Sequence, residues 1–202
     1  MDRKAHWETV YETKPQSDVS WYQAEPTLSL ELIRRVCPVD GRIIDIGGGA
    51  SMLVDRLLAL HFSSPAVLDI SAAAIARGKA RLGEKAQQAN WIVADVTQAR
   101  NIGQFDIWHD RAVFHFLTLL DDRRSYVDLA SRTLRSGGHL ILATFAPDGP
   151  TRCSGLEVCR YDAAAALLEL GKEFSLVHEE RESHVTPAGK RQSFFYGVFR
   201  RR

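Results

Sequence analysis

The sequence is short of three things that often identify a class of protein: paired cysteines, long apolar runs and a surplus of one charge. It has only three cysteines, an odd number with no zinc-ligand spacing, which favours a reduced, cytoplasmic protein over a disulfide-linked one. No apolar run reaches membrane-spanning length, and the polar amino terminus, MDRKAHWE, is unlike a secretory signal. Because 26 Lys and Arg balance 25 Asp and Glu, giving a formal net charge of +1, we expect neither nucleic acid nor a membrane surface as a partner.

What the sequence does contain is the composition of an ordinary globular chain. Hydrophobic residues make up 45% of its 202 residues and charged residues 25%, with no repeats or low-complexity tracts. A chain of this length can bury a substantial core, so we expect a single domain over residues 1–202 whose core spans 27–202. Residues 1–26 carry two aromatic clusters outside any sheet pattern, and we expect them to form an N-terminal lid or helical extension.

The most informative stretch is RIIDIGGGASML, from Arg42 to Leu53. Two β-branched residues lead into an acid, three glycines follow, and an apolar run then continues to Leu60. This is the pattern of a buried strand, a tight turn and the start of a helix. Glycine is needed where the backbone takes a positive φ or where a ligand touches the main chain. A glycine turn at the carboxyl end of a strand is the usual nucleotide site of an open α/β sheet.

From Gly41 onward, strand and helix patterns alternate, which predicts a parallel sheet with crossover helices. The later parallel strands are expected at 66–70, 91–93, 105–108 and 139–145. A helix is expected at 121–134, with Ser136-Gly137-Gly138 as its stop signal. The remaining expectations are a loop at His109-Asp110-Arg111, an irregular insert at 146–161 and a closing hairpin of 174–179 with 193–199.

Acidic residues end the next two strands. Asp69 follows Asp45 at the end of the second strand, where its carboxylate can accept both hydroxyls of a ribose. Asp95 ends the third strand on the same edge, within reach of an adenine amino group. A nicotinamide dinucleotide would also suit this arrangement, but two features argue against it. Met52 stands where the dinucleotide fingerprint needs a small residue, and no second domain is expected to carry hydride chemistry.

Together these residues resemble the class I S-adenosylmethionine-dependent methyltransferases over about residues 27–200. The motifs that carry the resemblance are Asp45–Ser51, Asp69, Asp95-Val96, Phe105–Trp108 and Leu134–Gly138. It implies an α/β, Rossmann-like three-layer sandwich: a seven-stranded, mostly parallel sheet with an antiparallel last strand and helices on both faces. It also implies S-adenosyl-L-methionine as the cofactor, and no metal site is expected.

The resemblance assigns the cofactor contacts to the strand ends. The glycine turn would cradle the methionine part, Asp69 the ribose, and Asp95 with the Val96 amide the adenine. The complete set of cofactor residues expected is Asp45, Gly47, Gly48, Gly49, Ser51, Asp69, Ile70, Asp95, Val96 and His109.

A narrower resemblance is to the thiopurine and tellurite methyltransferases, in which an N-terminal segment closes over a small, soft nucleophile. It is carried by His6-Trp7, Trp21-Tyr22, Trp108–Ala112, Asp122-Arg123-Arg124 and Tyr126. It implies substrate contacts from Trp21, Tyr22, Arg111 and Cys153. The chain departs from this group in having His109 after the fourth strand and a cysteine-bearing insert that holds Cys153 and Cys159.

The chemistry of methyl transfer limits the roles that side chains can take. The reaction is an in-line displacement at a sulfonium carbon, so the protein mainly aligns the reactants and excludes water. A thiolate acceptor needs no base, whereas an amine or hydroxyl loses a proton, and His109 stands where a base is expected. Asp110, the second catalytic candidate, is expected to form an internal ion pair or a substrate anchor with Arg111.

We therefore expect methyl transfer to a small-molecule acceptor, with a soft thiol or chalcogen nucleophile as one candidate. Two alternatives remain open. Protein-lysine methyltransferases carry an Asp-Lys or Asp-Arg pair at the same loop, so Asp110-Arg111 does not decide between the two classes. A non-catalytic cofactor-binding module that acts through a partner is the other. The sequence does not predict an oligomeric state.

Overall fold

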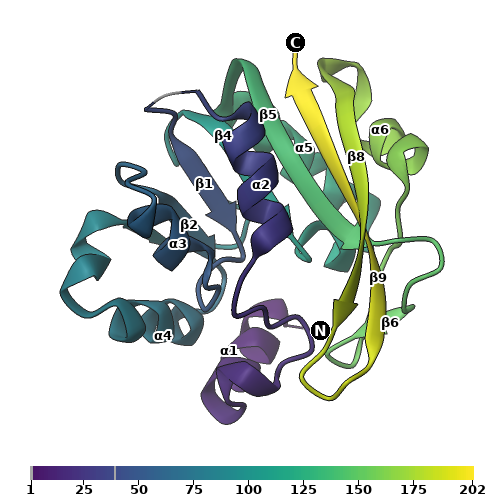
Figure 1. The fold of residues 1–202 in the computed structure, drawn as a ribbon. Helices are drawn as coiled ribbons and strands as arrows, with labels where there is room; N and C mark the ends of the chain where they lie inside the picture. Colours follow the sequence, from purple (N-terminus) through teal and green to yellow (C-terminus); the bar gives the residue numbers. More distant parts are fainter. Residues whose placement is uncertain (1, 39) are drawn as a thin grey trace.

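The strands form a seven-stranded sheet in the order β3-β2-β1-β4-β5-β9-β8 (Figure 1). The computed structural model describes residues 2–38 and 40–202. The strands of this sheet are β1 (Ile43–Ile46), β2 (Ala66–Asp69), β3 (Asn90–Val93), β4 (Phe105–Arg111), β5 (Leu134–Phe145), β8 (Phe174–Val185) and β9 (Arg191–Arg201). The helices are α1 (Arg3–Thr13), α2 (Thr27–Val36), α3 (Leu53–Ala59), α4 (Ala72–Leu82), α5 (Leu120–Thr133) and α6 (Ala163–Leu170). Short 3₁₀ segments are η1 (Gln16–Asp18), η2 (Gly83–Gln88), η3 (Phe114–Phe116) and η4 (Gly171–Glu173).

Helices lie on both faces of the sheet, as the side-chain pattern of β1 requires. Successive residues of a strand point to opposite faces, and both faces of β1 are buried. Ile43 packs in the cluster under α2 and α3, and Ile44 packs in the cluster under α5 and α6. The predicted Rossmann-like three-layer sandwich is therefore confirmed.

The strand directions create a crevice at one edge of the sheet. Strands β1 to β5 are parallel, and β9 runs antiparallel between β5 and β8. From β1 the chain proceeds outward to β2 and β3 and then returns to β4, on the other side of β1. Loops that leave the carboxyl ends of β1 and β4 therefore diverge, which is where open α/β sheets bind ligands.

Strand β4 is longer than the sequence pattern predicted. The loop expected at 109–111 is wrong, because all three residues belong to the strand. His109 pairs with Asp45 of β1 and Ile141 of β5, and Asp110 pairs with Ile46. Polar side chains at the end of a buried strand suggest a loop when only the sequence is known. Backbone hydrogen bonds to β1 on one side and β5 on the other keep residues 109–111 extended.

Three other boundaries differ from the prediction. The irregular insert at 146–161 contains a two-stranded sheet of β6 (Arg152–Cys153) and β7 (Leu156–Glu157). The closing hairpin is longer at both ends, although its turn lies around Pro187 as expected. The Gly137-Gly138 pair lies inside β5 and is not the end of α5. A Cβ on Gly138 would lie 2.9 Å from the carbonyl oxygen of Asp106, so close backbone approach explains this glycine.

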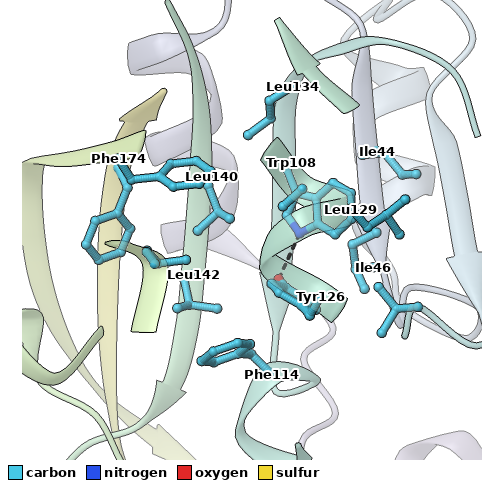
Figure 2. Close-up of a cluster of buried hydrophobic side chains, with 14 of the residues drawn as sticks. Ile44, Ile46, Trp108, Phe114, Tyr126, Leu129, Leu134, Leu140, Leu142 and Phe174 are labelled. Carbon is cyan, nitrogen blue, oxygen red and sulfur yellow. Dashed lines mark hydrogen bonds between the residues drawn. The ribbon is translucent and has the colours of Figure 1, made fainter. Parts of the chain in front are cut away.

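The core under α5 is built around one aromatic pair. Figure 2 shows Trp108 of β4 facing Tyr126 of α5, and the indole Nε1 donates a hydrogen bond to the Tyr126 hydroxyl at 2.8 Å. Both side chains are fully buried, and the two rings meet edge to face with centroids 5.4 Å apart. Burying such rings contributes about 2–3 kcal/mol each. This pair attaches β4 to α5 and so helps to set the position of the carboxyl end of β4.

Helix α1 lies beyond the carboxyl ends of the strands and packs against α4 (Figure 1). Asp2 caps this helix by accepting from the Ala5 N–H at 3.1 Å. The helix ends at Thr13, two residues before Pro15, which cannot continue a helix. Only Val10 and Tyr11 of this helix are buried. Within the described residues, none of the helices has the length and apolar character needed to span a bilayer.

Candidate active site

Two adjoining cavities lie at the carboxyl ends of the parallel strands. They comprise about 710 and 580 Å³ of space not filled by protein atoms, part of it open to solvent. We call them the first and the second cavity. The residues that line both are Tyr11, Trp21, Ile46, Gly47 and Arg111. The shared wall therefore combines the N-terminal segment (residues 2–26) with the ends of β1 and β4.

Asp69 lies on the wall of the first cavity, together with Ile70. Its Oδ2 accepts from the Gly49 N–H at 3.0 Å and its Oδ1 from the Ser71 N–H at 2.8 Å. Burial raises the pKa of Asp69 to about 6, even though these two donors favour the ionised form. The carboxylate thus ties the end of β2 to the glycine turn after β1.

Asp95 and Val96 form the far end of the first cavity. Oδ1 of Asp95 accepts from the Thr97 N–H at 2.8 Å and from its hydroxyl at 2.7 Å. Oδ2 accepts from Arg3 of α1 at 3.1 Å, and the same guanidinium reaches Asp122 at 2.8 Å. Arg3 could not be predicted as part of this site, because its partners lie about a hundred residues away in the chain.

The glycine turn forms the floor of the second cavity, where Gly47, Gly48 and Ser51 line the wall. Gly47 has φ +70°, and a Cβ there would lie 2.2 Å from the Val113 side chain. A Cβ on Gly48 would lie 2.1 Å from Oδ2 of Asp45. These positions tolerate no side chain, so the main chain itself faces the cavity. Gly49 accounts for the contact with Asp69 and lines neither cavity.

Asp45 and His109 lie side by side beneath this floor, and both line the second cavity. Nδ1 of His109 lies 2.7 Å from Oδ1 of Asp45, and its Nε2 lies 2.9 Å from the Ser29 hydroxyl on α2. A carboxylate only accepts, so Nδ1 donates to Asp45, while Nε2 shares a hydrogen bond with the Ser29 hydroxyl. Both ring nitrogens of His109 are therefore engaged. The other oxygen of Asp45, Oδ2, is buried and has no hydrogen-bond partner among residues 2–38 and 40–202.

Asp110 faces away from both cavities. Its carboxylate is fully buried and accepts from the Tyr126 hydroxyl at 2.7 Å and the Val113 N–H at 2.9 Å. Burial raises the pKa of Asp110 to about 6, although these hydrogen bonds by themselves lower it. The expected ion pair with Arg111 is wrong, because neighbouring residues of a strand point to opposite faces.

The predicted substrate residues separate into two groups. Trp21 lines both cavities, Tyr22 lines the second, and Arg111 lies at the wall that both share. Cys153 lines neither cavity. Its sulfur lies 3.9 Å from the Ser20 hydroxyl, and burial raises the pKa of the thiol to about 11. Cys153 and Cys159 pack in different hydrophobic clusters and are free thiols.

The N-terminal segment supplies side chains that sequence reasoning missed. Glu8 of α1 accepts from the Ser71 hydroxyl at 2.7 Å and from the Ala72 and Ala73 N–H groups at 2.9 and 3.0 Å. Burial opposes its ionisation, but these donors at the start of α4 lower the pKa of Glu8 overall. Trp7, which belongs to the stretch expected to form an N-terminal lid or helical extension, lines the first cavity.

A second missed residue holds the glycine turn from the side. Arg81 of α4 donates to the carbonyl oxygens of Ala50 at 3.1 Å and Ser51 at 2.6 Å. It also binds the Asp55 carboxylate at 2.7 Å and the Gln16 side chain of the N-terminal segment at 3.0 Å. In the sequence this arginine looks like an ordinary cation in the last turn of a helix.

The comparisons with known proteins agree on the domain type. Residues 44–140 match the family model described as "Methyltransferase domain". No curated protein matches the sequence. Among solved structures, one similar chain comes from work on the conversion of a disulfide bond into a thioacetal group during echinomycin biosynthesis. It is 17% identical, with a TM-score of 0.80, over 98% of this chain and 92% of that one.

Two further structures were solved with bound S-adenosylhomocysteine. The N-methyltransferase NodS from Bradyrhizobium japonicum WM9 is 18% identical, with a TM-score of 0.72, over 96% of this chain and 97% of that one. The 1,6-didemethyltoxoflavin-N1-methyltransferase of Burkholderia thailandensis, which also holds 1,6-didemethyltoxoflavin, is 16% identical, with a TM-score of 0.72, over 98% and 86%. At these identities the likeness concerns the fold.

Proposed function

We propose that this chain, which carries the domain and the fold of the class I S-adenosylmethionine-dependent methyltransferases, transfers a methyl group from S-adenosyl-L-methionine to a small-molecule acceptor. The observation that carries the proposal is the set of carboxylates around the glycine turn. Asp45 lies near the end of β1, Asp69 is the last residue of β2 and Asp95 follows β3, and all three line the two adjoining cavities. Three acids in this arrangement suit the hydroxyl and amino donors of an adenosine and an amino acid.

The residues of the cavities fit this cofactor. Asp69 would accept the ribose hydroxyls, and Asp95 with the Val96 amide would hold the adenine. The buried, unpartnered Oδ2 of Asp45 beside the Gly48 main chain offers an acceptor to the ammonium of the methionine part. When bound, the cofactor supplies a methyl group on a sulfonium. The chain contributes binding, orientation and the exclusion of water.

The cover of the first cavity supports a small acceptor. Trp7, Trp21 and Phe116 line it, with ring centroids 5.6 Å apart for Trp7 and Trp21 and 5.0 Å apart for Trp7 and Phe116. We propose that the N-terminal segment forms a lid over the first cavity, with Trp21, Tyr22 and Arg111 next to the acceptor. A protein-lysine acceptor would instead need an open rim to admit a peptide.

The engagement of His109 supports an acceptor that needs no base from the protein. Both of its ring nitrogens are hydrogen-bonded and only 3% of the residue is exposed, so the proposal does not use His109 as a general base. A thiol that ionises near neutral pH is already nucleophilic in water, and we therefore propose a soft thiol or chalcogen acceptor. The three free cysteines support a reducing, cytoplasmic location.

Calorimetry and label transfer test the proposal in sequence. Titration with S-adenosylhomocysteine should give a Kd of about 1 μM or tighter, and titration with NAD should give no heat. Labelled S-adenosylmethionine is then incubated with 4-nitrothiophenol, aniline, phenol and a lysine-rich protein in separate reactions. We expect label in the thiol. A folded chain that gives no heat with S-adenosylhomocysteine contradicts the cofactor assignment, and label in the protein alone favours the lysine alternative.

A further inference from the structure

Arg111, at the end of β4, binds three segments that are far apart in the sequence. Its Nε donates to the Tyr196 hydroxyl on β9 at 2.8 Å, and its Nη1 donates to the Trp21 carbonyl oxygen at 3.0 Å. Its Nη2 lies 3.4 Å from the Glu182 carboxylate on β8. The guanidinium carbon also lies 4.4 Å from the centre of the Phe194 ring. Each of the three guanidinium nitrogens therefore has a partner.

Glu182 is the second half of the same arrangement. It accepts from the Tyr196 hydroxyl at 3.1 Å and from the Gln23 amide at 2.9 Å, in addition to facing Arg111. The side chains of Arg111 and Glu182 are only 9% and 19% exposed. A buried pair of this kind is sustained by the additional hydrogen bonds at both ends. Two of those bonds go to the N-terminal segment, at Trp21 and Gln23.

The N-terminal segment is thus attached at the place where it crosses the cavities. The Ser20 carbonyl accepts from His184 Nε2 at 2.8 Å, next to the bond between Arg111 and the Trp21 carbonyl. The Trp21 ring lies at the wall shared by both cavities and packs edge-on against Tyr11, 6.4 Å away. Hydrogen bonds from side chains of the hairpin and β4 to the backbone of the N-terminal segment therefore set the position of this ring.

We propose that Arg111 is a positioning residue that fixes Trp21 over the two cavities and so controls how long a bound cofactor is retained. The inference deepens the proposed function, on which the retention step rests. The planar guanidinium reaches the Trp21 carbonyl, the Tyr196 hydroxyl and Glu182 in three directions at once. A lysine ammonium is a single point on a flexible stem and cannot span all three. The role is therefore specific to arginine and not to positive charge.

Hydrogen exchange and cofactor dissociation test this role in Arg111→Lys. Amides of residues 19–23 should exchange about tenfold faster in the free variant than in the parent, because a restraint on the segment is lost. S-adenosylhomocysteine should dissociate about tenfold faster in stopped-flow experiments, with a smaller change in its association rate. Arg181→Lys is the matched control, since Arg181 also lies on the hairpin but pairs with Asp148 at the surface. It should leave both rates at parental values.

A second variant keeps the test valid if the first is unstable. Arg111→Met combined with Glu182→Gln removes the pair without leaving a buried charge alone, and it should show the same two changes. Parental exchange and parental dissociation in both Arg111 variants overturn the proposal while leaving the methyltransferase assignment intact. If the parent itself does not bind S-adenosylhomocysteine, the proposed function fails, and the exchange rates still decide whether Arg111 holds the segment.

Discussion

His109 and Asp45 are joined by a hydrogen bond of 2.7 Å between Nδ1 and Oδ1, at a point where β4 and β1 lie directly side by side. The imidazole links the floor of the second cavity to Ser29 of α2, since its other nitrogen is 2.9 Å from that hydroxyl. In this position the histidine orients a carboxylate, and both of its ring nitrogens are engaged.

The first prediction follows for His109→Gln. Loss of the bond leaves the buried Asp45 less well compensated, so the free energy of unfolding should fall by about 2–4 kcal/mol and S-adenosylhomocysteine should bind more weakly. Urea unfolding and calorimetry measure the two effects, with His178→Gln at the surface as the control. A base acting on the acceptor predicts the opposite result: unchanged cofactor binding, with kcat losing its dependence on an ionisation.

Asp69→Asn should weaken S-adenosylhomocysteine binding about ten- to a hundredfold, because a charged acceptor for the ribose becomes neutral. The amide oxygen can still accept from the Gly49 or Ser71 N–H, so the turn should stay folded. Asp128→Asn, at an exposed pair on α5, is the control. Binding as tight as in the parent would show that the ribose lies elsewhere.

The same carboxylate predicts a pH dependence of binding. The pKa of Asp69 is about 6 in the free chain, so protonation below that pH removes the acceptor that the ribose needs. Affinity for S-adenosylhomocysteine should fall about tenfold per pH unit below 6 and stay level above it. Calorimetry from pH 5 to 8 measures this, and Asp69→Asn should show a flat profile over the same range.

Asp110→Asn should change how stability depends on pH. The folded pKa of Asp110, about 6, lies above the unfolded value, so the folded chain holds this proton more tightly. The resulting stability is present below about pH 4 and is lost as pH rises through 6. The Asn variant lacks this ionisation, and its free energy of unfolding should drop less between pH 4 and 8, by on the order of 2 kcal/mol. Parallel slopes for the two proteins would contradict the buried position of the carboxylate.

Cys153→Ala should leave methyl transfer to 4-nitrothiophenol within about twofold of the parent. The thiol lines neither cavity, and a pKa of about 11 keeps it protonated at neutral pH. Trp21→Ala is the comparison, because it opens the wall shared by both cavities and should reduce the rate far more. A large loss of methyl-transfer rate in the cysteine variant would instead support a contact between Cys153 and the substrate.

The part of the site that could be predicted is the part encoded by local patterns. The three glycines, Asp69 and Asp95 lie at or just after the ends of strands, and the parallel topology brings these strand ends together. Ser71 is of a residue type that commonly caps helices, and its hydroxyl accepts from the Ala74 N–H at 3.0 Å.

What could not be predicted depends on partners far away in the chain. Arg111 meets Glu182 across 71 residues, and Glu8 meets Ser71 across 63. No spacing rule connects such pairs. The extension of β4 through His109 has the same origin, because pairing with two neighbouring strands outweighs the weak strand propensity of His-Asp-Arg.

The carboxylate of Glu8 on the first turn of α4 has a consequence for which nucleotides the chain can admit. The amino end of a helix that follows the second strand is positively polarised and would ordinarily attract a phosphate. Here Glu8 already occupies the N–H groups of Ala72 and Ala73. A ligand that carried a phosphate on its ribose would have to displace α1 and face a like charge. We therefore expect the Glu8 carboxylate to weaken the binding of nucleotides that carry a phosphate on the ribose.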